Sequence, residues 1–148
     1  MGTKARCVFF GVFLLLALSV ATPEAFADGF LYSAGVYTAI AGPGVAHGIN
    51  SSGEMVEGDG FVDSGGTFTT ISVPGAVSTS AFGINDAGQI VGSYSTGSGT
   101  FGFVDNGGVF TTINVTSTGP TFAFGINNLG QIVGKTVLIL TADSAMGS

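Results

Sequence analysis

The chain of 148 residues has few of the side chains on which most enzyme and nucleic-acid sites depend. It contains one cysteine, one histidine, three basic residues and no tryptophan. Cys7 and two of the basic residues, Lys4 and Arg6, lie near the N-terminus. A zinc cluster, a disulfide framework and a cysteine nucleophile are therefore excluded from the rest of the sequence. The net charge of −6 argues against a nucleic-acid partner, because phosphate binding needs clustered Lys and Arg.

The first 27 residues have the order of segments typical of a secretory signal peptide. Two basic residues precede an apolar run from Cys7 to Val20, and Ala25-Phe26-Ala27 is a small-x-small cleavage site. The apolar run is shorter than the roughly 20 residues that a membrane-spanning helix needs. An uncleaved N-terminal anchor is the alternative. We expect cleavage after Ala27, no membrane span in the mature chain, and a secreted or periplasmic protein.

Glycine is abundant, with 26 residues, and much of it falls into two motifs that alternate three times. The glycine-isoleucine-asparagine (GIN) motif, Gly-Ile-Asn-x-x-Gly-Gln/Glu, begins at Gly48, Gly83 and Gly125. The glycine-phenylalanine (GF) motif, Gly-Phe-Leu/Val followed by Phe/Tyr-Thr-x-Ile, begins at Gly29, Gly60 and Gly102. No Gly-X-Y period exists, so collagen is excluded. Such a repeat is typical of solenoids and propellers.

The repeats predict three tandem units at about 28–58, 59–92 and 93–135, followed by a non-repeat tail at 136–148. Each unit has four short runs of Val, Ile, Phe, Tyr and Thr between turn residues, which is strand composition. Asn85-Asp86-Ala87-Gly88 suits a type I turn, and Asn106-Gly107 is typical of tight hairpins. We therefore predict an all-β fold of tandem four-stranded antiparallel units. These would form an incomplete β-propeller-like array or an open stack of sheets.

The alternation of the two motifs, with Val73-Pro74-Gly75-Ala76 between them, resembles the bacterial extracellular HAF repeats. The resemblance covers residues 28 to about 135 and implies a secreted protein with propeller-like β-structure. The His-Ala-Phe that names the family is replaced here by Asp28-Gly29-Phe30, Asp59-Gly60-Phe61 and Phe101-Gly102-Phe103. No role for a histidine therefore carries over. The family has no established common activity, so the resemblance informs fold and export rather than function.

Three units are fewer than the roughly four blades that a closed propeller needs. Three explanations remain open. The chain is a truncated remnant of a longer repeat protein, it assembles with copies of itself, or it is an open module whose tail covers one edge. Exposed sheet edges pair readily with another chain, which favours self-association.

One unit carries a cluster of acidic residues. Glu57 and Asp59 stand two apart on a predicted strand and would point to one face. Together with Asp63 they are weak candidates for a calcium site, and as a pair they are candidates for glycoside hydrolysis. Solubilising charge on a hairpin is the favoured interpretation. We expect His47, which aligns with Phe82 and Phe124, to be a partly buried packing residue.

One hairpin tip, residues 95–100, is longer than its equivalents, and we expect it to form a ligand-contact loop. Its candidate residues are Tyr94, Ser95, Ser98 and Phe101, of which we expect the two aromatic residues to be exposed. The sequence thus predicts a secreted binding or structural module without catalytic residues or cofactor, whose partner is a polysaccharide, a matrix component or another copy. The alternatives are a carboxylate-dependent carbohydrate-active hydrolase using Glu57 and Asp59, and a non-functional fragment of a longer repeat protein.

Overall fold

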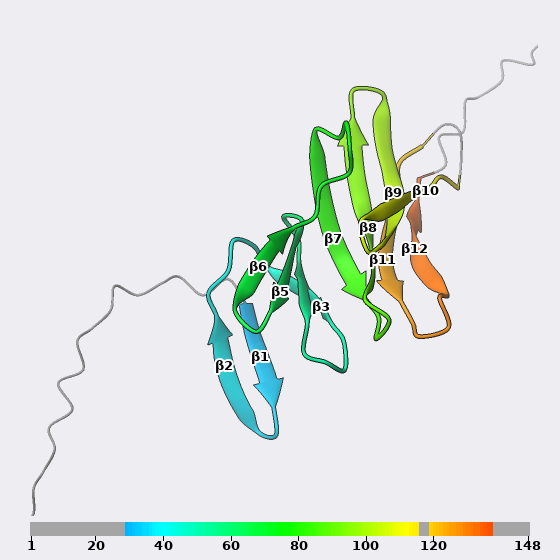
Figure 1. Ribbon diagram of the computed structural model, residues 1–148. Helices are drawn as coiled ribbons and strands as arrows, with labels where there is room; N and C mark the ends of the chain where they lie inside the picture. The colour runs from blue at the N-terminus through cyan, green and yellow to red at the C-terminus, as the bar shows by residue number, and fades with distance from the viewer. Residues whose placement is uncertain (1–28, 116–118, 138–148) are drawn as a thin grey trace, which may run out of the picture.

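The computed structural model describes residues 29–115 and 119–137, and within them it contains twelve strands and no helix (Figure 1). The predicted signal peptide and residues 138–148 of the predicted tail lie outside this range. The strands are β1 (Gly29–Ser33), β2 (Val36–Ile40), β3 (Ala46–Ile49), β4 (Met55–Glu57), β5 (Phe61–Ser64), β6 (Thr67–Thr70), β7 (Ser78–Ile84), β8 (Gln89–Thr96), β9 (Gly99–Asn106), β10 (Val109–Ile113), β11 (Thr121–Ile126) and β12 (Ile132–Thr136). The predicted all-β class is confirmed.

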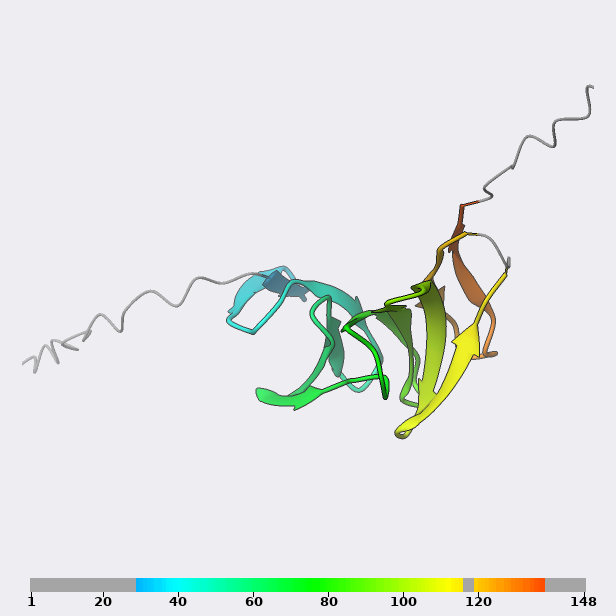
Figure 2. The same ribbon diagram turned by 90° about the horizontal axis from the view of Figure 1, so that it is seen from above.

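The strands form four separate antiparallel sheets that follow one another in chain order. The two central sheets have four strands each, β3-β4-β5-β6 and β7-β8-β9-β10, and every strand pairs with its neighbour in sequence. The first and last sheets have only two strands, β1-β2 and β11-β12. Figure 2 shows the four sheets side by side along an arc, with the two small sheets at its ends. The array is open, and none of its sheets closes into a barrel.

The complete sheets begin and end at other points of the repeat than the units predicted from the sequence. Within a complete sheet the hairpin of the GIN motif comes first and the hairpin of the GF motif second, as in β7-β8 and β9-β10. The complete sheets therefore cover residues 46–70 and 78–113, and the boundaries drawn at 58/59 and 92/93 fall inside them. The repeat period is visible in the sequence, but its phase depends on which of two connections crosses to the next sheet.

The hairpins that end the two complete sheets share one turn geometry. Gly65-Gly66 and Gly107-Gly108 are two-residue loops whose φ angles are all positive, between 60° and 90°. Positive φ at both loop positions is typical of the type I′ turn, whose twist matches that of the flanking strands. The loop of β1-β2 has the same form, although Ala34 takes the first position with a φ of 50°. This shared turn shows that the hairpin β1-β2 is equivalent to the hairpins β5-β6 and β9-β10.

The apolar core lies between the two complete sheets. Its largest fully buried apolar side chain is Phe103, and Val56 is buried from the facing sheet. The connection from β6 to β7 contributes Ile71 and Val73, which are also buried. After Val73 the chain turns through Pro74 and Gly75, which fits a type II turn with glycine at φ 79°. The connection thus both fills the core and leads the chain to the next sheet.

A β-bulge interrupts the first hairpin of each sheet that carries the GIN motif. The register shifts between residues 46 and 48, 81 and 83, and 123 and 125. The extra residues are His47, Phe82 and Phe124, and bulges re-aim side chains in this way. The ring of Phe82 contacts the rings of His47 and Phe124 edge-on, with centroid distances of 5.3 and 5.5 Å. His47 therefore contacts Phe82 in a column of rings that crosses three sheets, but its side chain is exposed rather than partly buried as expected, because it stands at the end of the column.

Next to this ring column the strands β3, β7 and β11 approach each other closely at glycine. A Cβ built on Gly48 would lie 2.9 Å from the carbonyl oxygen of Phe82. A Cβ built on Gly83 would lie 3.0 Å from the Cα of Gly125. A side chain at either position would push neighbouring sheets apart.

We expect Gly83→Ala to lower the free energy of unfolding by about 1–3 kcal/mol, because the added methyl group overpacks the contact between β7 and β11. Gly97→Ala is the matched control, since a Cβ at Gly97 has open space around it, and should change stability by less than about 0.5 kcal/mol. Urea unfolding of the two variants measures the difference. Equal stabilities would contradict the close approach of the sheets.

Candidate functional site: the open ends of the sheet array

Each GIN turn is closed by the side chain of its asparagine. The Oδ1 atom of Asn85 accepts hydrogen bonds from the backbone amides of Ala87 (3.1 Å) and Gln89 (2.9 Å). Its Nδ2 atom donates to Oε1 of Gln89 (2.9 Å). Asn50 and Asn127 make the same three kinds of bond in their turns. The asparagines therefore have the structural role that turn chemistry predicts.

The same asparagines also connect one sheet to the next. Nδ2 of Asn50 donates to the backbone carbonyl of Asn85 (3.3 Å), and Nδ2 of Asn85 donates to that of Asn127 (3.1 Å). We call this row of bonds the asparagine ladder. Asn50 and Asn85 are buried, whereas Asn127, at the end of the ladder, is exposed.

A second row of bonds runs parallel to the asparagine ladder through Asp86. Its carboxylate accepts hydrogen bonds from the backbone amide of Ser51 (2.7 Å) and from Nδ2 of Asn128 (2.6 Å). These bonds, that of the Ser51 amide first, hold the pKa of Asp86 below its ordinary value because they stabilise the ionised form. The charge of Asp86 thus links three consecutive sheets.

Two of the acidic residues singled out from the sequence, Glu57 and Asp63, accept hydrogen bonds from backbone amides of a loop and a turn. Glu57 is fully buried, and its Oε2 accepts a hydrogen bond from the backbone amide of Gly44 (2.9 Å). Asp63 is buried and accepts from the amide of Gly66 (2.7 Å), which closes the β5-β6 turn. Asp59 is exposed. Across residues 29–115 and 119–137, no three His, Cys, Asp or Glu side chains gather closely enough to hold a metal ion.

The predicted carboxylate pair is likewise not arranged for hydrolysis. Glu57 and Asp59 stand two apart, but β4 ends at Glu57, so Asp59 is not on the same strand. A fully buried carboxylate that is bonded to a backbone amide cannot reach a sugar from its present position. The geometry therefore lends no support to a site made of these two acids.

The hairpin of β8 and β9 differs from expectation in which residues are exposed. Tyr94 and Phe101 are half-buried rather than exposed, with ring centroids 5.6 Å apart, and Tyr94 packs against the core. The hydroxyl of Tyr94 is hydrogen-bonded to that of Thr112 (2.8 Å). Ser95 is half-buried and bonded to Thr100, so Ser98 alone of the four candidate residues is exposed. β8 and β9 pair along their whole length, so Tyr94 and Phe101 lie opposite each other within the sheet rather than in a loop at its tip.

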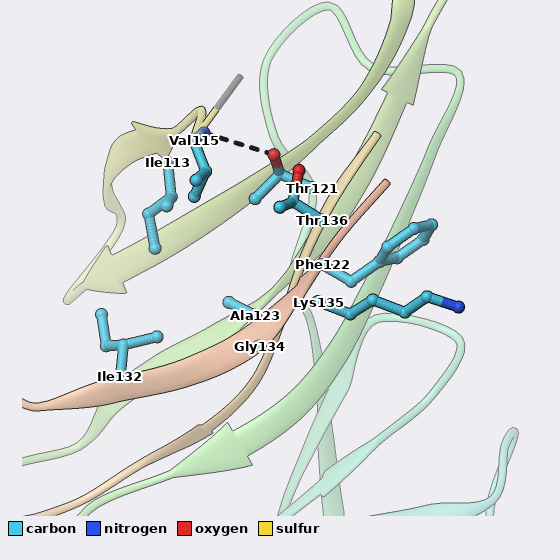
Figure 3. A pocket seen from close by; sticks show the side chains of 9 residues that line it. All are labelled: Ile113, Val115, Thr121, Phe122, Ala123, Ile132, Gly134, Lys135 and Thr136. Carbon is cyan, nitrogen blue, oxygen red and sulfur yellow. Dashed lines mark hydrogen bonds between the residues drawn. The ribbon is translucent and has the colours of Figure 1, made fainter. Parts of the chain in front are cut away.

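An apolar pocket of about 380 Å³ lies beside the last sheet, β11-β12 (Figure 3). Ile113 lines it from the end of β10, Val115 from the connection after β10, and Ala123 and Ile132 from β11 and β12. Figure 3 shows these four side chains on one side of the hairpin, while Phe122 and Lys135 project to the other side.

The preceding sheet shows what occupies the equivalent place. The counterparts of the four apolar pocket residues are Ile71, Val73, Ala81 and Ile90, all of which are buried in the core. There the ring of Phe103, from the third strand of the sheet, fills the space. It lies over Gly92, the counterpart of Gly134, so closely that a Cβ on Gly92 would be 2.8 Å from it. The pocket is therefore the place that a phenylalanine from a third strand would fill, and within residues 29–115 and 119–137 the last sheet has only two strands.

The first sheet has the opposite deficiency. β1 and β2 carry a GF motif, and Phe30 and Tyr37 are 67% and 72% exposed although their rings touch. The sequence predicted an open array with exposed edges, but not which motif lies at each end. The signal is the order of the motifs, since within residues 29–137 the series starts with a GF motif and ends with a GIN motif.

Comparisons with protein-family models, with curated proteins and with solved structures gave no match. In the part of the chain that the structure describes, no helix is long and apolar enough to cross a membrane. Interpretation of the site therefore depends on its geometry alone.

We expect Asn85→Ala to lower the free energy of unfolding by about 2–4 kcal/mol, because it removes four hydrogen bonds and leaves buried groups unsatisfied. Asn127→Ala is the matched control and should cost about 1 kcal/mol, since its position is exposed and ends the ladder. Denaturant unfolding of both variants measures the effects. Equal losses would show that the asparagine ladder does not stabilise the sheet contacts.

We expect Asp86→Asn to lower the thermal unfolding midpoint at neutral pH. A lowered pKa in the folded state means that the ionised carboxylate stabilises the fold above the ordinary pKa, and that this stabilisation is lost as the pH falls through the lowered value. The difference between wild type and variant should therefore narrow progressively below about pH 4. A difference that stays constant down to about pH 3 would contradict the role given to this charge.

Proposed function

We propose that this chain is an exported, non-catalytic β-repeat module, related to the HAF repeats, that acts by binding β-strands at the open edge of its last sheet. The observation that carries this proposal is the apolar pocket beside β11-β12, at the place where Phe103 fills the preceding sheet. A partner strand would pair with β12 and extend the sheet, and a suitably placed aromatic residue of that strand would at the same time fill the pocket.

Strand addition to an open edge is a general mode of recognition. Main-chain hydrogen bonds supply affinity, and pockets for alternate side chains supply specificity. The edge of β12 meets both requirements, because its strand is in register with β11 and the pocket lies on one face. Val133 and Ile132 are 68% and 37% exposed there, an unusual position for apolar strand residues.

The inventory of reactive side chains supports a role in binding rather than catalysis. The single histidine packs in the ring column, and the carboxylates of Glu57 and Asp63 bond to backbone amides. Export is supported by the order of basic, apolar and small residues at the N-terminus. A secreted module with these properties fits a structural or binding role at a cell surface.

We expect a synthetic peptide that copies residues 102–113 to bind the purified protein, because it carries the strand and the phenylalanine that fill the same place in the preceding sheet. A peptide with alanine at the position of Phe103 should bind at least about tenfold more weakly, since burying a phenylalanine contributes about 1.5–3 kcal/mol. Fluorescence anisotropy with labelled peptides measures both affinities.

The site on the protein is checked with Ile132→Lys, which places a charge in the pocket and should weaken binding of the peptide. Leu129→Lys, on the exposed turn between β11 and β12, is the matched control and should leave binding unchanged. Equal binding of the two peptides, or an Ile132→Lys variant that binds as well as wild type, would overturn the proposed function.

A second candidate function is glycan binding at the tip of the β8-β9 hairpin. The tip groups hydroxyl side chains beside an aromatic pair: Ser95 bonds to Thr100, and Thr96 bonds to Ser98 at 2.8 Å. Aromatic faces and hydroxyl groups together suit the apolar and polar surfaces of a sugar.

If this second function holds, replacing residues 95–100 by Asn-Gly should abolish retention of the protein on a glycan array, because the hydroxyl cluster is removed while a two-residue loop preserves the hairpin. The exposed turn variant Leu129→Ala serves as the control. Unchanged retention of the shortened hairpin would exclude the tip as a glycan site.

A further inference from the structure

The two incomplete sheets of this protein are complementary halves of one complete sheet. β11-β12 has the bulge and the asparagine turn of a first hairpin. β1-β2 has the GF motif and the two-residue loop of a second hairpin. In both complete sheets the two hairpins are joined by pairing of the second strand with the third, β4 with β5 and β8 with β9. The equivalent pair would be β12 with β1.

The complete sheets also define the register of this missing pair. Val91 pairs with Val104 and Gly92 with Phe103 between β8 and β9. The same register occurs between β4 and β5, where Val56 pairs with Val62. Transferred to the open ends, it pairs Val133 with Leu31 and Gly134 with Phe30.

Exposure at the two ends matches what this pairing would bury. Phe103 is fully buried in its sheet, whereas its counterpart Phe30 is 67% exposed. Val91 is likewise fully buried, whereas its counterpart Val133 is 68% exposed. Among the Gly-Phe-aliphatic sequences of this chain, that of β1 is the one not already part of a four-stranded sheet. Phe30 is therefore the phenylalanine available for the pocket.

The number of sheets that a closed ring needs favours pairing with a second copy over closure within one chain. The described residues of one copy form two complete sheets and two halves, so joining the two halves within one copy would make a ring of three sheets, fewer than the roughly four that a propeller needs. Two copies would make six, within the usual range of about four to eight. The two halves also lie at opposite ends of the arc in both views (Figures 1 and 2).

We propose that β1-β2 of a second copy completes β11-β12, and reciprocally, so that two copies close a ring of six four-stranded sheets. This inference rests on the proposed function, because it requires β12 to accept a strand, and it names the partner as the chain itself. Each Phe30 then fills the apolar pocket of the other copy.

The ring also continues the contacts that link the sheets within one copy. After β11-β12, the next sheet would be β3-β6 of the second copy. Nδ2 of Asn127 would then donate to the backbone carbonyl of the second copy's Asn50, extending the asparagine ladder. Phe124, which is 47% exposed, would pack against the second copy's His47 as Phe82 does within one chain.

The register is tested by disulfide cross-linking between two separately purified variants. Both are the mature chain expected after cleavage at Ala27, which contains no native cysteine; one carries Leu31→Cys and the other Val133→Cys. Mixed and mildly oxidised, they should form a reducible dimer of one chain of each kind, detected with different tags. A mixture of Leu31→Cys with Leu129→Cys, an exposed position out of register, is the matched control. No cross-link, or equal cross-linking in the control, would overturn the proposed pairing.

Sedimentation of the purified protein tests the ring and the role of the phenylalanine. Wild type should sediment as a dimer, and Phe30→Ala should dissociate at a concentration at least about tenfold higher, because an aromatic anchor at an interface dominates its affinity. Phe68→Ala, in a complete sheet, is the control and should remain dimeric. A monodisperse wild-type monomer, or a dimer insensitive to Phe30→Ala, would overturn the inference. If the peptide of residues 102–113 still bound such a monomer, the proposed function would stand without it.

Discussion

The close approach of successive first strands is the constraint on which the rest of this structure depends. β3, β7 and β11 meet at Gly48, Gly83 and Gly125, where a side chain would contact the backbone of the next strand. This approach brings the ring of each bulge residue and the amide of each GIN asparagine within reach of the next sheet. A small four-stranded sheet cannot cover its own faces, so these contacts are what make the array a single fold.

Because each sheet of the array is stabilised by contact with its neighbours, the first and the last sheet each have one face without such a contact in the described part of the chain. At one end, no phenylalanine of the described part of the chain lies over Gly134 as Phe103 lies over Gly92, and an apolar pocket is found there. At the other end the first sheet exposes Phe30 and Tyr37. Solenoid proteins usually manage such ends with polar capping repeats. Here both ends expose apolar side chains and carry complementary motifs, as the proposed pairing of two copies requires.

Several sequence features gave correct expectations because their physical basis is local. The all-β class follows from strand composition between turn residues, and the packing role of His47 follows from its alignment with Phe82 and Phe124. The structural role of the asparagine turns is local for the same reason. The exposure expected of Tyr94 and Phe101 was wrong. The two residues pair with each other within the sheet, and Tyr94 packs against the core. Glu57, Asp59 and Asp63 are close in sequence, but among the described residues they do not gather into a group that could hold a metal ion.

The sequence by itself determined the repeat, its strands and its turns, since these depend on residues within one hairpin. Only the tertiary structure decided the phase of the repeat, because either of two connections could have crossed to the next sheet. That phase decides the function proposed for the molecule. If the GF hairpin came first, residues 29–57 would form a complete sheet. With the GIN hairpin first, β1-β2 and β11-β12 are each half of a sheet, and the exposed phenylalanine and the apolar pocket lie on separate ends of the array.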